Sequence, residues 1–378
     1  MTDRTTHLDA LGEADARIKS RSRWSALADQ PALWVALLDV ALVLLFGAIS
    51  PGHVFFNAGN FTNMALDSAQ IVLIAAGLAM LLGAGELDIS VGANIILASV
   101  LGGKAMVAVA GTPEEVVQGI YPHLIRGLVV GMVVALLSGI AFGIVNAFVV
   151  TVMRVNSFIA TLGTLGIGTG AALVISGGTN VESIPPSLQT GFGVRAVWGI
   201  PLPALVTLAC VVVLWFLVTK TRYGIHTLAI GSSREAASRA GIRIERHVVS
   251  LFVIVGLLAG IASIFDLSRF STTNLSGHQS DALAAIAGAV IGGTKLFGGR
   301  VSITGAVFGA ILASVLQTGL IIQGFSPFYQ LIVVGITLIV AVYIRGGDAE
   351  GQARATFGTQ IQRILRKRTQ KRGERDEG

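Results

Sequence analysis

The sequence predicts an all-α fold of the polytopic membrane class, with about ten transmembrane segments and some broken or re-entrant helices. Hydrophobic residues make up 53% of the 378 residues, and charged residues make up only 13%. The mean hydropathy is +0.76. Apolar runs of about 20 residues, the length that crosses a bilayer, recur along the chain. Soluble domains rarely combine these properties, whereas helical membrane proteins do so routinely.

Ten apolar runs are long enough to serve as transmembrane spans. They lie near residues 32–49, 66–84, 88–110, 124–150, 157–177, 198–219, 247–266, 280–298, 301–323 and 327–345. Glycine and polar residues interrupt the third and the eighth run, so either can be a half-helix or a re-entrant segment buried in the bundle. We therefore expect a transmembrane domain over residues 31–345, between a polar tail at 1–30 and a basic tail at 346–378.

Glycine pairs predict close contacts between some of these spans. Gly166 with Gly170, and Gly256 with Gly260, have the spacing that brings two small residues onto one face of a helix. Such pairs let transmembrane backbones approach each other closely. We interpret both pairs as packing positions.

The basic residues predict the orientation of the spans. Of the 27 lysine and arginine residues, all but Lys104, Arg126, Arg195 and Arg269 lie in the two tails or on one side of the membrane. Cytoplasmic loops carry such an excess of positive charge. We expect a multi-pass protein of the bacterial inner (plasma) membrane with both termini in the cytoplasm. The net charge of +6 is then explained by topology and by contact with membrane lipid, and it predicts no nucleic-acid partner.

A polar segment at 220–247 separates the sixth span from the seventh. Its centre reads AIGSSREAASRAGI at 229–242. Ser232 and Glu235 have the spacing of a capping box and Gly241 is a natural stop, so we expect a helix of about two turns between them. So short a helix needs a surface to lie on. It can rest on the protein's own cytoplasmic ends, or it can dock into a separate cytoplasmic protein and transmit that protein's motion to the spans.

No catalytic residue and no metal ligand is expected in this chain. The sequence contains no Walker-type phosphate loop, and its six histidines are scattered. We interpret His226, His247 and His278 as interfacial residues. The single cysteine, Cys210, lies in an apolar run and offers no disulfide. We therefore expect a transport subunit that is not an enzyme and binds no cofactor, with its energy supplied by a partner.

Acidic residues near the spans are few and lie close to span ends. They are Glu86, Asp88, Asp266 and Asp281. A pump driven by protons or sodium usually needs several intramembrane carboxylates or a paired relay, so neutral cargo is the natural inference. The alternative is a secondary transporter or channel for a small neutral solute, working without an ATPase partner.

Four motif stretches stand in order across most of the chain. They are GELDISVG at 85–92, NSFIATLGT at 156–164, YGIHTLAIGSSREAASRAGI at 223–242 and IGGTKLFGGRVSITGAVFGA at 291–310. Each is similar to a signature of the ribose-type permease subunits of bacterial ATP-binding-cassette (ABC) importers, a family that serves monosaccharides and related small polyols. The chain departs from that pattern at several positions. Lys295 replaces a serine, Ser233 an asparagine, Asn156 a proline, and Val301 the glycine expected after Arg300.

The resemblance implies a permease subunit that moves a monosaccharide or small polyol by alternating access. Its implied partners are cytoplasmic ABC ATPase subunits that use ATP and Mg, a periplasmic or lipid-anchored sugar-binding protein, and a second permease copy in a homodimer or heterodimer. In the family, the third stretch meets the ATPase. The resemblance therefore assigns the coupling contact to Arg234, Glu235, Ala236, Ala237, Ser238, Arg239, Ala240 and Gly241.

Polar residues at broken spans are candidates for the substrate pathway. Asp88, followed by Ser90 and Asn94, can cap a half-helix toward a central cavity, or can simply cap a helix at the membrane surface. The other pathway candidates are Asn156, Thr161 and Thr164. Asn146, Asn180 and Gln317 are further polar positions, and each can make a hydrogen bond between helices instead.

Overall fold

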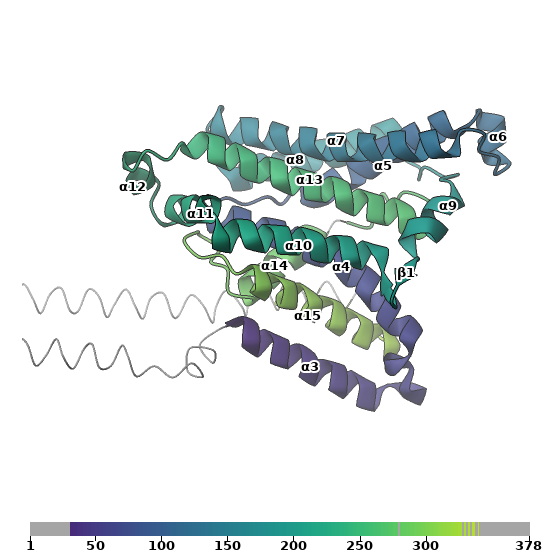
Figure 1. The fold of residues 1–378 in the computed structure, drawn as a ribbon, viewed down its shortest axis with the longest axis horizontal. Helices are drawn as coiled ribbons and strands as arrows, with labels where there is room; N and C mark the ends of the chain where they lie inside the picture. The colour runs from purple at the N-terminus through teal and green to yellow at the C-terminus, as the bar shows by residue number, and fades with distance from the viewer. Residues whose placement is uncertain are drawn as a thin grey trace, which may run out of the picture.

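The computed structural model describes residues 31–278 and 280–326, together with residues 329, 332, 335, 336 and 339. Eight long helices form a bundle whose axes run in broadly the same direction (Figure 1). They are α3 (Pro31–Ile49), α4 (Ala58–Gly83), α5 (Val91–Ala110), α7 (Leu124–Thr151), α8 (Ser157–Ser176), α10 (Leu202–Lys220), α13 (Ile244–Phe270) and α15 (Ile303–Ile322). All eight are long and apolar enough to cross a membrane. The predicted all-α, polytopic membrane class is therefore confirmed.

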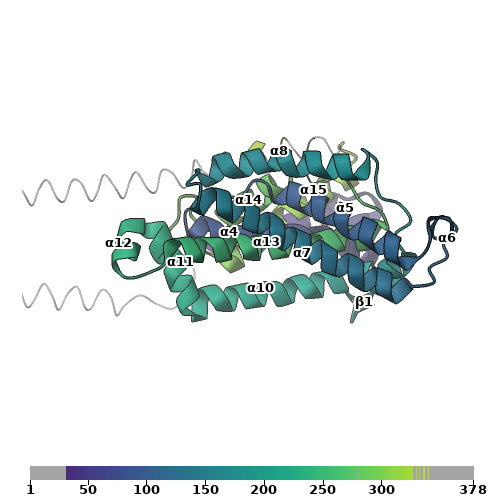
Figure 2. The same cartoon turned by 90° about the horizontal axis from the view of Figure 1, so that it is seen from above.

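Short elements lie at the two ends of the bundle. α11 (Arg222–Ser232) and α12 (Arg234–Arg239) lie at one end, and α6 (Pro113–Val117) and α9 (Pro186–Leu188) lie at the other (Figures 1 and 2). The remaining short elements are the 3-10 turn at Pro51–Phe56, the π turn at Gln189–Gly193, and the paired strands β1 (Ala196–Val197) and β2 (Ile200–Pro201). These two strands are the only ones in the described part of the chain.

The structure resolves the two uncertain spans differently. The third predicted span is a continuous helix, α5, of 20 residues. The eighth becomes α14 (Asp281–Ile291), which has 11 residues and is therefore only about 16 Å long at 1.5 Å per residue. Because a bilayer core is about 30 Å thick, α14 is a half-helix. The tenth predicted span, at 327–345, lies almost wholly outside the described residues.

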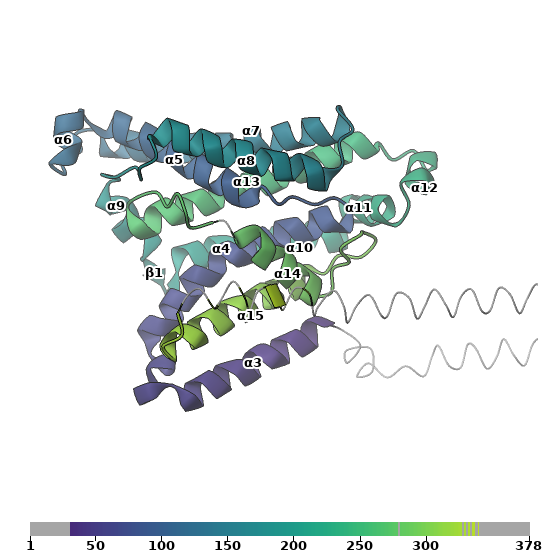
Figure 3. The same cartoon turned by 180° about the vertical axis from the view of Figure 1, so that it is seen from behind.

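α4 and α13 form the centre of the bundle. In their most apolar stretches, 78% of the α4 residues and 67% of the α13 residues are buried, against 28% in each of α3, α7, α8 and α10. Figure 3 shows α5, α7, α8 and α13 grouped on one side of α4, with α3 and α15 on the other. The apolar outer faces of the peripheral helices are exposed in the isolated chain and suit contact with lipid.

Glycines bring α7 and α13 into backbone contact. A Cβ atom added at Gly139 would lie 2.4 Å from the carbonyl oxygen of Gly256 and 2.7 Å from the amide nitrogen of Gly260. The predicted close approach at the Gly256 and Gly260 pair is thus confirmed. Around Gly166 and Gly170 on α8, an added Cβ would meet nothing within 4 Å, so in the described chain that pair packs against no other helix.

We expect Gly139→Ala to lower the melting temperature of the detergent-purified protein. The added methyl group meets backbone atoms that cannot rotate away, and overpacking of this kind costs about 1–3 kcal/mol. Gly170→Ala is the matched control, since it adds the same methyl group on a membrane helix into open space. Equal melting temperatures for the two variants, measured by fluorescence-detected size exclusion, would contradict the tight α7–α13 contact.

Candidate coupling site and cargo cavity

The expected short helix forms, but its cap differs from the prediction by one residue. α12 begins at Arg234, and the side chain of Ser233 accepts a hydrogen bond from the amide of Ala236 at 3.3 Å. Ser232 is still the last residue of α11, and its hydroxyl donates to the carbonyl of Leu228 instead. The predicted capping box of Ser232 with Glu235 is therefore wrong, because α11 continues through Ser232 and takes up its side chain.

The end of α12 follows the prediction. Gly241 has φ of +82°, a left-handed conformation that glycine adopts readily. Ala237 is the one buried residue of the predicted coupling set, and it packs into the main core of the bundle. The other seven members are exposed: Arg234, Glu235, Ala236, Ser238, Arg239, Ala240 and Gly241. The helix thus rests on the bundle through one alanine and presents the rest of its surface outward.

An ion pair joins α12 to the first motif stretch. Arg234, the first residue of α12, contacts the carboxylate of Glu86 in the segment between α4 and α5. The Glu86 side chain is 5% exposed and the Arg234 side chain 55% exposed. A buried charge that loses its partner is strongly destabilising, by about 3–5 kcal/mol when both partners are buried. Because Glu86 is held in the bundle, the ion pair ties α12 to the segment that precedes α5.

Three glycine segments meet beside this ion pair. A Cβ atom at Gly231 would lie 2.0 Å from the carbonyl oxygen of Gly83 and 2.6 Å from the amide nitrogen of Gly299. The amide of Gly299 also donates a hydrogen bond to the carbonyl of Gly83, at 3.0 Å. α4, the third motif stretch and the fourth motif stretch therefore touch through their backbones.

The second motif stretch is bonded to the same region. The amide of Leu87 donates to the Ser157 hydroxyl at 3.1 Å, and the amide of Ile89 donates to the Thr161 hydroxyl at 3.2 Å. The first motif stretch thereby contacts the second and the third, and Gly83, two residues before it, contacts the fourth. We name this meeting point, formed by Gly83, Glu86, Ser157, Gly231, Arg234 and Gly299, the coupling junction.

Four of the six predicted pathway residues belong to one buried network next to the coupling junction: Asp88, Ser90, Thr161 and Thr164. Asp88 accepts hydrogen bonds from the amide and the hydroxyl of Ser90, at 2.8 and 2.6 Å. Asn146 donates to the Ser90 hydroxyl at 2.8 Å and accepts from the Thr164 hydroxyl at 2.7 Å. The Thr161 hydroxyl donates to the carbonyl of Ser157 at 2.8 Å. These bonds tie α5 to α7 and α8.

The other two predicted pathway residues lie apart. Asn94 donates to the carbonyl of Gly139 at 3.2 Å, and Asn156 caps α8 by accepting from the amide of Phe158 at 3.0 Å. Asn156 also lines a hollow of about 550 Å³ between the junction and the start of α8. A role for these residues in the substrate pathway stays a prediction, and their visible contacts are with other protein groups.

A separate cavity of about 250 Å³ opens among α4, α13, α14 and α15. Its polar wall comes from the first half of α4, the last turns of α13 and α15, and the segment that leads from α13 into the start of α14, so it lies toward the end of the bundle opposite α12. The polar lining residues are Asp67, Gln70, Asp266, Arg269, Asn274, His278, Ser280, Asp281 and Gln317. Of these, sequence reasoning named only Gln317 as a polar pathway position.

Two of the three histidines predicted to be interfacial are buried within the bundle. His278 is buried beside two carboxylates, and His247 is buried at the start of α13, where its Nε2 lies 2.8 Å from the Thr227 hydroxyl. The partners of each histidine are distant in the sequence or on another turn. No local pattern in the sequence therefore predicted these contacts.

Comparison with known proteins identifies the family of the chain. The family model described as "Branched-chain amino acid transport system / permease component" matches residues 60–342. The D-allose transport system permease protein of Escherichia coli (strain K12) is 32% identical over 301 residues, covering 80% of this chain and 87% of that protein. The ribose import permease protein of Bacillus subtilis (strain 168) is 33% identical over 304 residues, covering 80% and 89%.

A third relative extends the set of sugars named. The L-arabinose transport system permease protein of Escherichia coli (strain K12) is 31% identical over 283 residues, covering 75% of this chain and 81% of that protein. No solved structure matches the chain. The chain therefore belongs to the branched-chain amino acid transport system permease family, and its motifs and relatives group it with the ribose-type ABC importer permeases.

Proposed function

We propose that this chain is the transmembrane permease subunit of an ABC importer for a monosaccharide or a related small polyol. The observation that carries the proposal is the coupling junction, where the end of α4 and the first motif stretch together contact the other three stretches beneath an exposed helix. The relatives whose names specify D-allose, ribose and L-arabinose support the sugar class. A secondary transporter works without an ATPase partner, so it has no need of an exposed helix that is bonded to a buried carboxylate.

In this mechanism the energy comes from partner subunits. Two cytoplasmic ATPase subunits bind ATP and Mg, close on each other, and move α12 of each permease copy. Arg234 and Ala237 pass that movement into the bundle through Glu86 and the core. The permease itself binds no cofactor and catalyses no reaction, and it works as a homodimer or a heterodimer.

The proposed orientation puts α12 in the cytoplasm and the α6 end outside the inner membrane. Both termini are then cytoplasmic, which agrees with the excess of basic residues on that side. A periplasmic or lipid-anchored binding protein delivers the sugar to the outer end. The 250 Å³ cavity lies toward that end and is slightly smaller than pockets for drug-sized ligands, which measure about 300–1,000 Å³.

Purification from native membranes tests the proposal. A tagged chain is expected to bring down an ATPase, and ATP hydrolysis by that complex should rise when a sugar-loaded binding protein is added. The purified chain alone, in liposomes, should move no labelled sugar in response to a proton or sodium gradient. Gradient-driven uptake by the chain alone would overturn the proposal and support the secondary-transporter alternative.

Glu235→Arg is expected to lower stimulated ATP hydrolysis by about tenfold, because a reversed charge in a docking surface opposes the partner. Within the described residues, Glu235 pairs only with Arg239, at 3.6 Å, and both side chains are more than 80% exposed. Exposed pairs contribute about 0–1 kcal/mol, so membrane insertion and melting temperature should not change. Glu235→Gln should give an intermediate rate. Wild-type stimulation in both variants would remove Glu235 from the coupling contact.

A further inference from the structure

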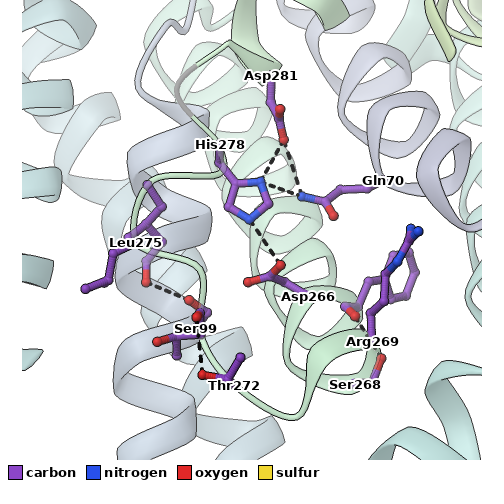
Figure 4. Close-up of polar contacts among 12 residues, drawn as sticks. Gln70, Ser99, Asp266, Ser268, Arg269, Thr272, Leu275, His278 and Asp281 are labelled. Atoms are coloured by element: carbon purple, nitrogen blue, oxygen red, sulfur yellow. Dashed lines mark hydrogen bonds and ion pairs between the residues drawn. The ribbon is translucent and has the colours of Figure 1, made fainter. Parts of the chain in front are cut away.

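A buried histidine stands between two carboxylates in the wall of the 250 Å³ cavity (Figure 4). The Nδ1 atom of His278 lies 2.8 Å from Asp281 Oδ2, and its Nε2 atom lies 3.3 Å from Asp266 Oδ1. An imidazole ring offers a donor on both sides only when both nitrogens carry protons. The amide nitrogen of Gln70 lies 3.0 Å from His278 Nδ1 and 3.4 Å from Asp281 Oδ2.

The cluster joins segments that are distant in the sequence. Gln70 comes from α4, Asp266 from α13, His278 from the segment after α13, and Asp281 from the start of the half-helix α14. His278 is 6% exposed and Asp266 is 2% exposed. Ionic groups at this depth are expensive and usually mark a functional position. The cluster therefore links α4, α13 and α14 to one another in the wall of the cavity.

One oxygen of this cluster has no protein partner. Asp266 Oδ2 accepts no hydrogen bond from any described residue, although Asp266 is almost completely buried. A buried acceptor without a donor costs about 1–3 kcal/mol, and more when it is charged. Figure 4 shows this oxygen turned away from His278. Asp266 also lines the cavity, so a ligand there is placed to supply the missing donor.

The rest of the cavity wall suits a neutral ligand with several hydroxyl groups. The side-chain amides of Asn274 and Gln317 make no hydrogen bond with another described residue, so their donors and acceptors are free for a ligand. Phe265 and Phe270 add apolar surface. Asp67 and Arg269 form an ion pair, so their charges largely neutralise each other. The described residues contain no group of three His, Cys, Asp or Glu side chains suited to a metal ion.

We propose that this cavity holds the cargo sugar during translocation and that Asp266 accepts hydrogen bonds from the sugar's hydroxyl groups. His278 is the positioning residue that orients the Asp266 carboxylate; Asp281 holds the ring from its other side and itself accepts a hydrogen bond from the Gln70 amide. Asn274 and Gln317 contact other hydroxyl groups. The proposal rests on the proposed function and adds to it the place and the chemistry of cargo recognition.

The test uses the complete importer in liposomes, with its co-purified ATPase and binding protein. Uptake of labelled D-ribose, D-allose, L-arabinose and D-galactose is measured together with ATP hydrolysis. For Asp266→Asn we expect uptake to fall at least about tenfold, because the site loses a charged acceptor for a hydroxyl donor. ATP hydrolysis stimulated by the loaded binding protein should stay within about twofold of wild type, since the coupling junction is unchanged. Asp39→Asn is the matched control and should leave uptake unchanged, because Asp39 is also buried with unpartnered oxygens but lies on α3 away from the cavity.

A second variant separates cargo contact from a structural role. Gln317→Leu removes an amide that bonds to no described residue, so a structural role predicts no change. Cargo contact predicts a higher half-saturating sugar concentration and a changed ratio of rates among the four sugars. This variant decides the proposal even if Asp266→Asn fails to fold. Wild-type uptake and wild-type sugar preference in Gln317→Leu would overturn it.

The outcome for the wild-type complex separates this inference from the proposed function. If the wild-type complex takes up none of the four sugars and its ATP hydrolysis is not stimulated, the proposed function fails. If the wild-type complex works and the cavity variants work equally well, only the cavity assignment fails.

Discussion

Arg234→Gln is expected to reduce ATP-driven sugar uptake at least about tenfold, because it leaves the buried carboxylate of Glu86 without its cationic partner. A buried charge that loses its partner is destabilising, and this ion pair is the contact that joins α12 to the first motif stretch. The carboxylate then draws the segment between α4 and α5 toward water or takes up a proton. In either case, α12 loses its direct hold on the first motif stretch.

A double-mutant cycle makes this prediction specific. Glu86→Gln keeps the side-chain size and removes the buried charge, so it should impair uptake less than Arg234→Gln does. The double variant should transport faster than Arg234→Gln alone, because its buried group is neutral. Arg126→Gln, at the opposite end of the bundle, is the control for removing an exposed arginine. A double variant as slow as Arg234→Gln would show that the pair itself does not couple the two segments.

The class of the protein could be predicted from the sequence because membrane spans leave a local signal. A run of apolar residues is read within a window of about 20 positions, whatever its neighbours are. α14 shows the limit of that signal: the apolar pattern over 280–298 was long enough to span, yet the helix ends at Ile291. Beyond it, Gly292 packs so closely on α15 that an added Cβ would lie 2.0 Å from the carbonyl oxygen of Gly305. Gly293 has φ of +109° and has left the helical conformation, so the glycine pair at 292–293 ends α14 within a run that hydropathy alone reads as continuous.

The short helix α12 was predicted within one residue because capping residues and a glycine stop are also local signals. The ion pair beneath it was not predicted, since Glu86 and Arg234 lie in different motif stretches and only the fold brings them together. The same holds for the cavity. Gln70 meets His278 across 208 positions of sequence. A single sequence indicates which residues are unusual, and the three-dimensional contacts decide which of them act as a unit.

Gly231→Ala is expected to abolish ATP-driven uptake while the protein still inserts into the membrane. The new Cβ would lie 2.0 Å from the carbonyl oxygen of Gly83 and 2.6 Å from the amide nitrogen of Gly299. Both are backbone atoms, so the methyl group fits only if the coupling junction opens, at a cost of about 1–3 kcal/mol or more. Gly191→Ala, in the π turn at the opposite end, adds a methyl group into open space and should transport normally. Normal uptake by Gly231→Ala would contradict the tight junction.

Gly83→Ala provides the complementary test, because its clash is with a side chain. The added Cβ would lie 1.9 Å from a methyl carbon of Val301 and 3.4 Å from the Val301 Cβ. Val301 stands where the resembling permeases have glycine, so this chain fills with a valine the space that an alanine at position 83 would need. Gly83→Ala should therefore impair uptake, and Gly83→Ala with Val301→Ala should restore it, since the nearest remaining neighbours, Val301 Cβ at 3.4 Å and Thr227 Cγ2 at 3.6 Å, are at ordinary contact distances. Val301→Ala should not rescue Gly231→Ala, whose neighbours are backbone. Rescue of both glycine variants by Val301→Ala, or of neither, would contradict the neighbours that the structure gives to these two glycines.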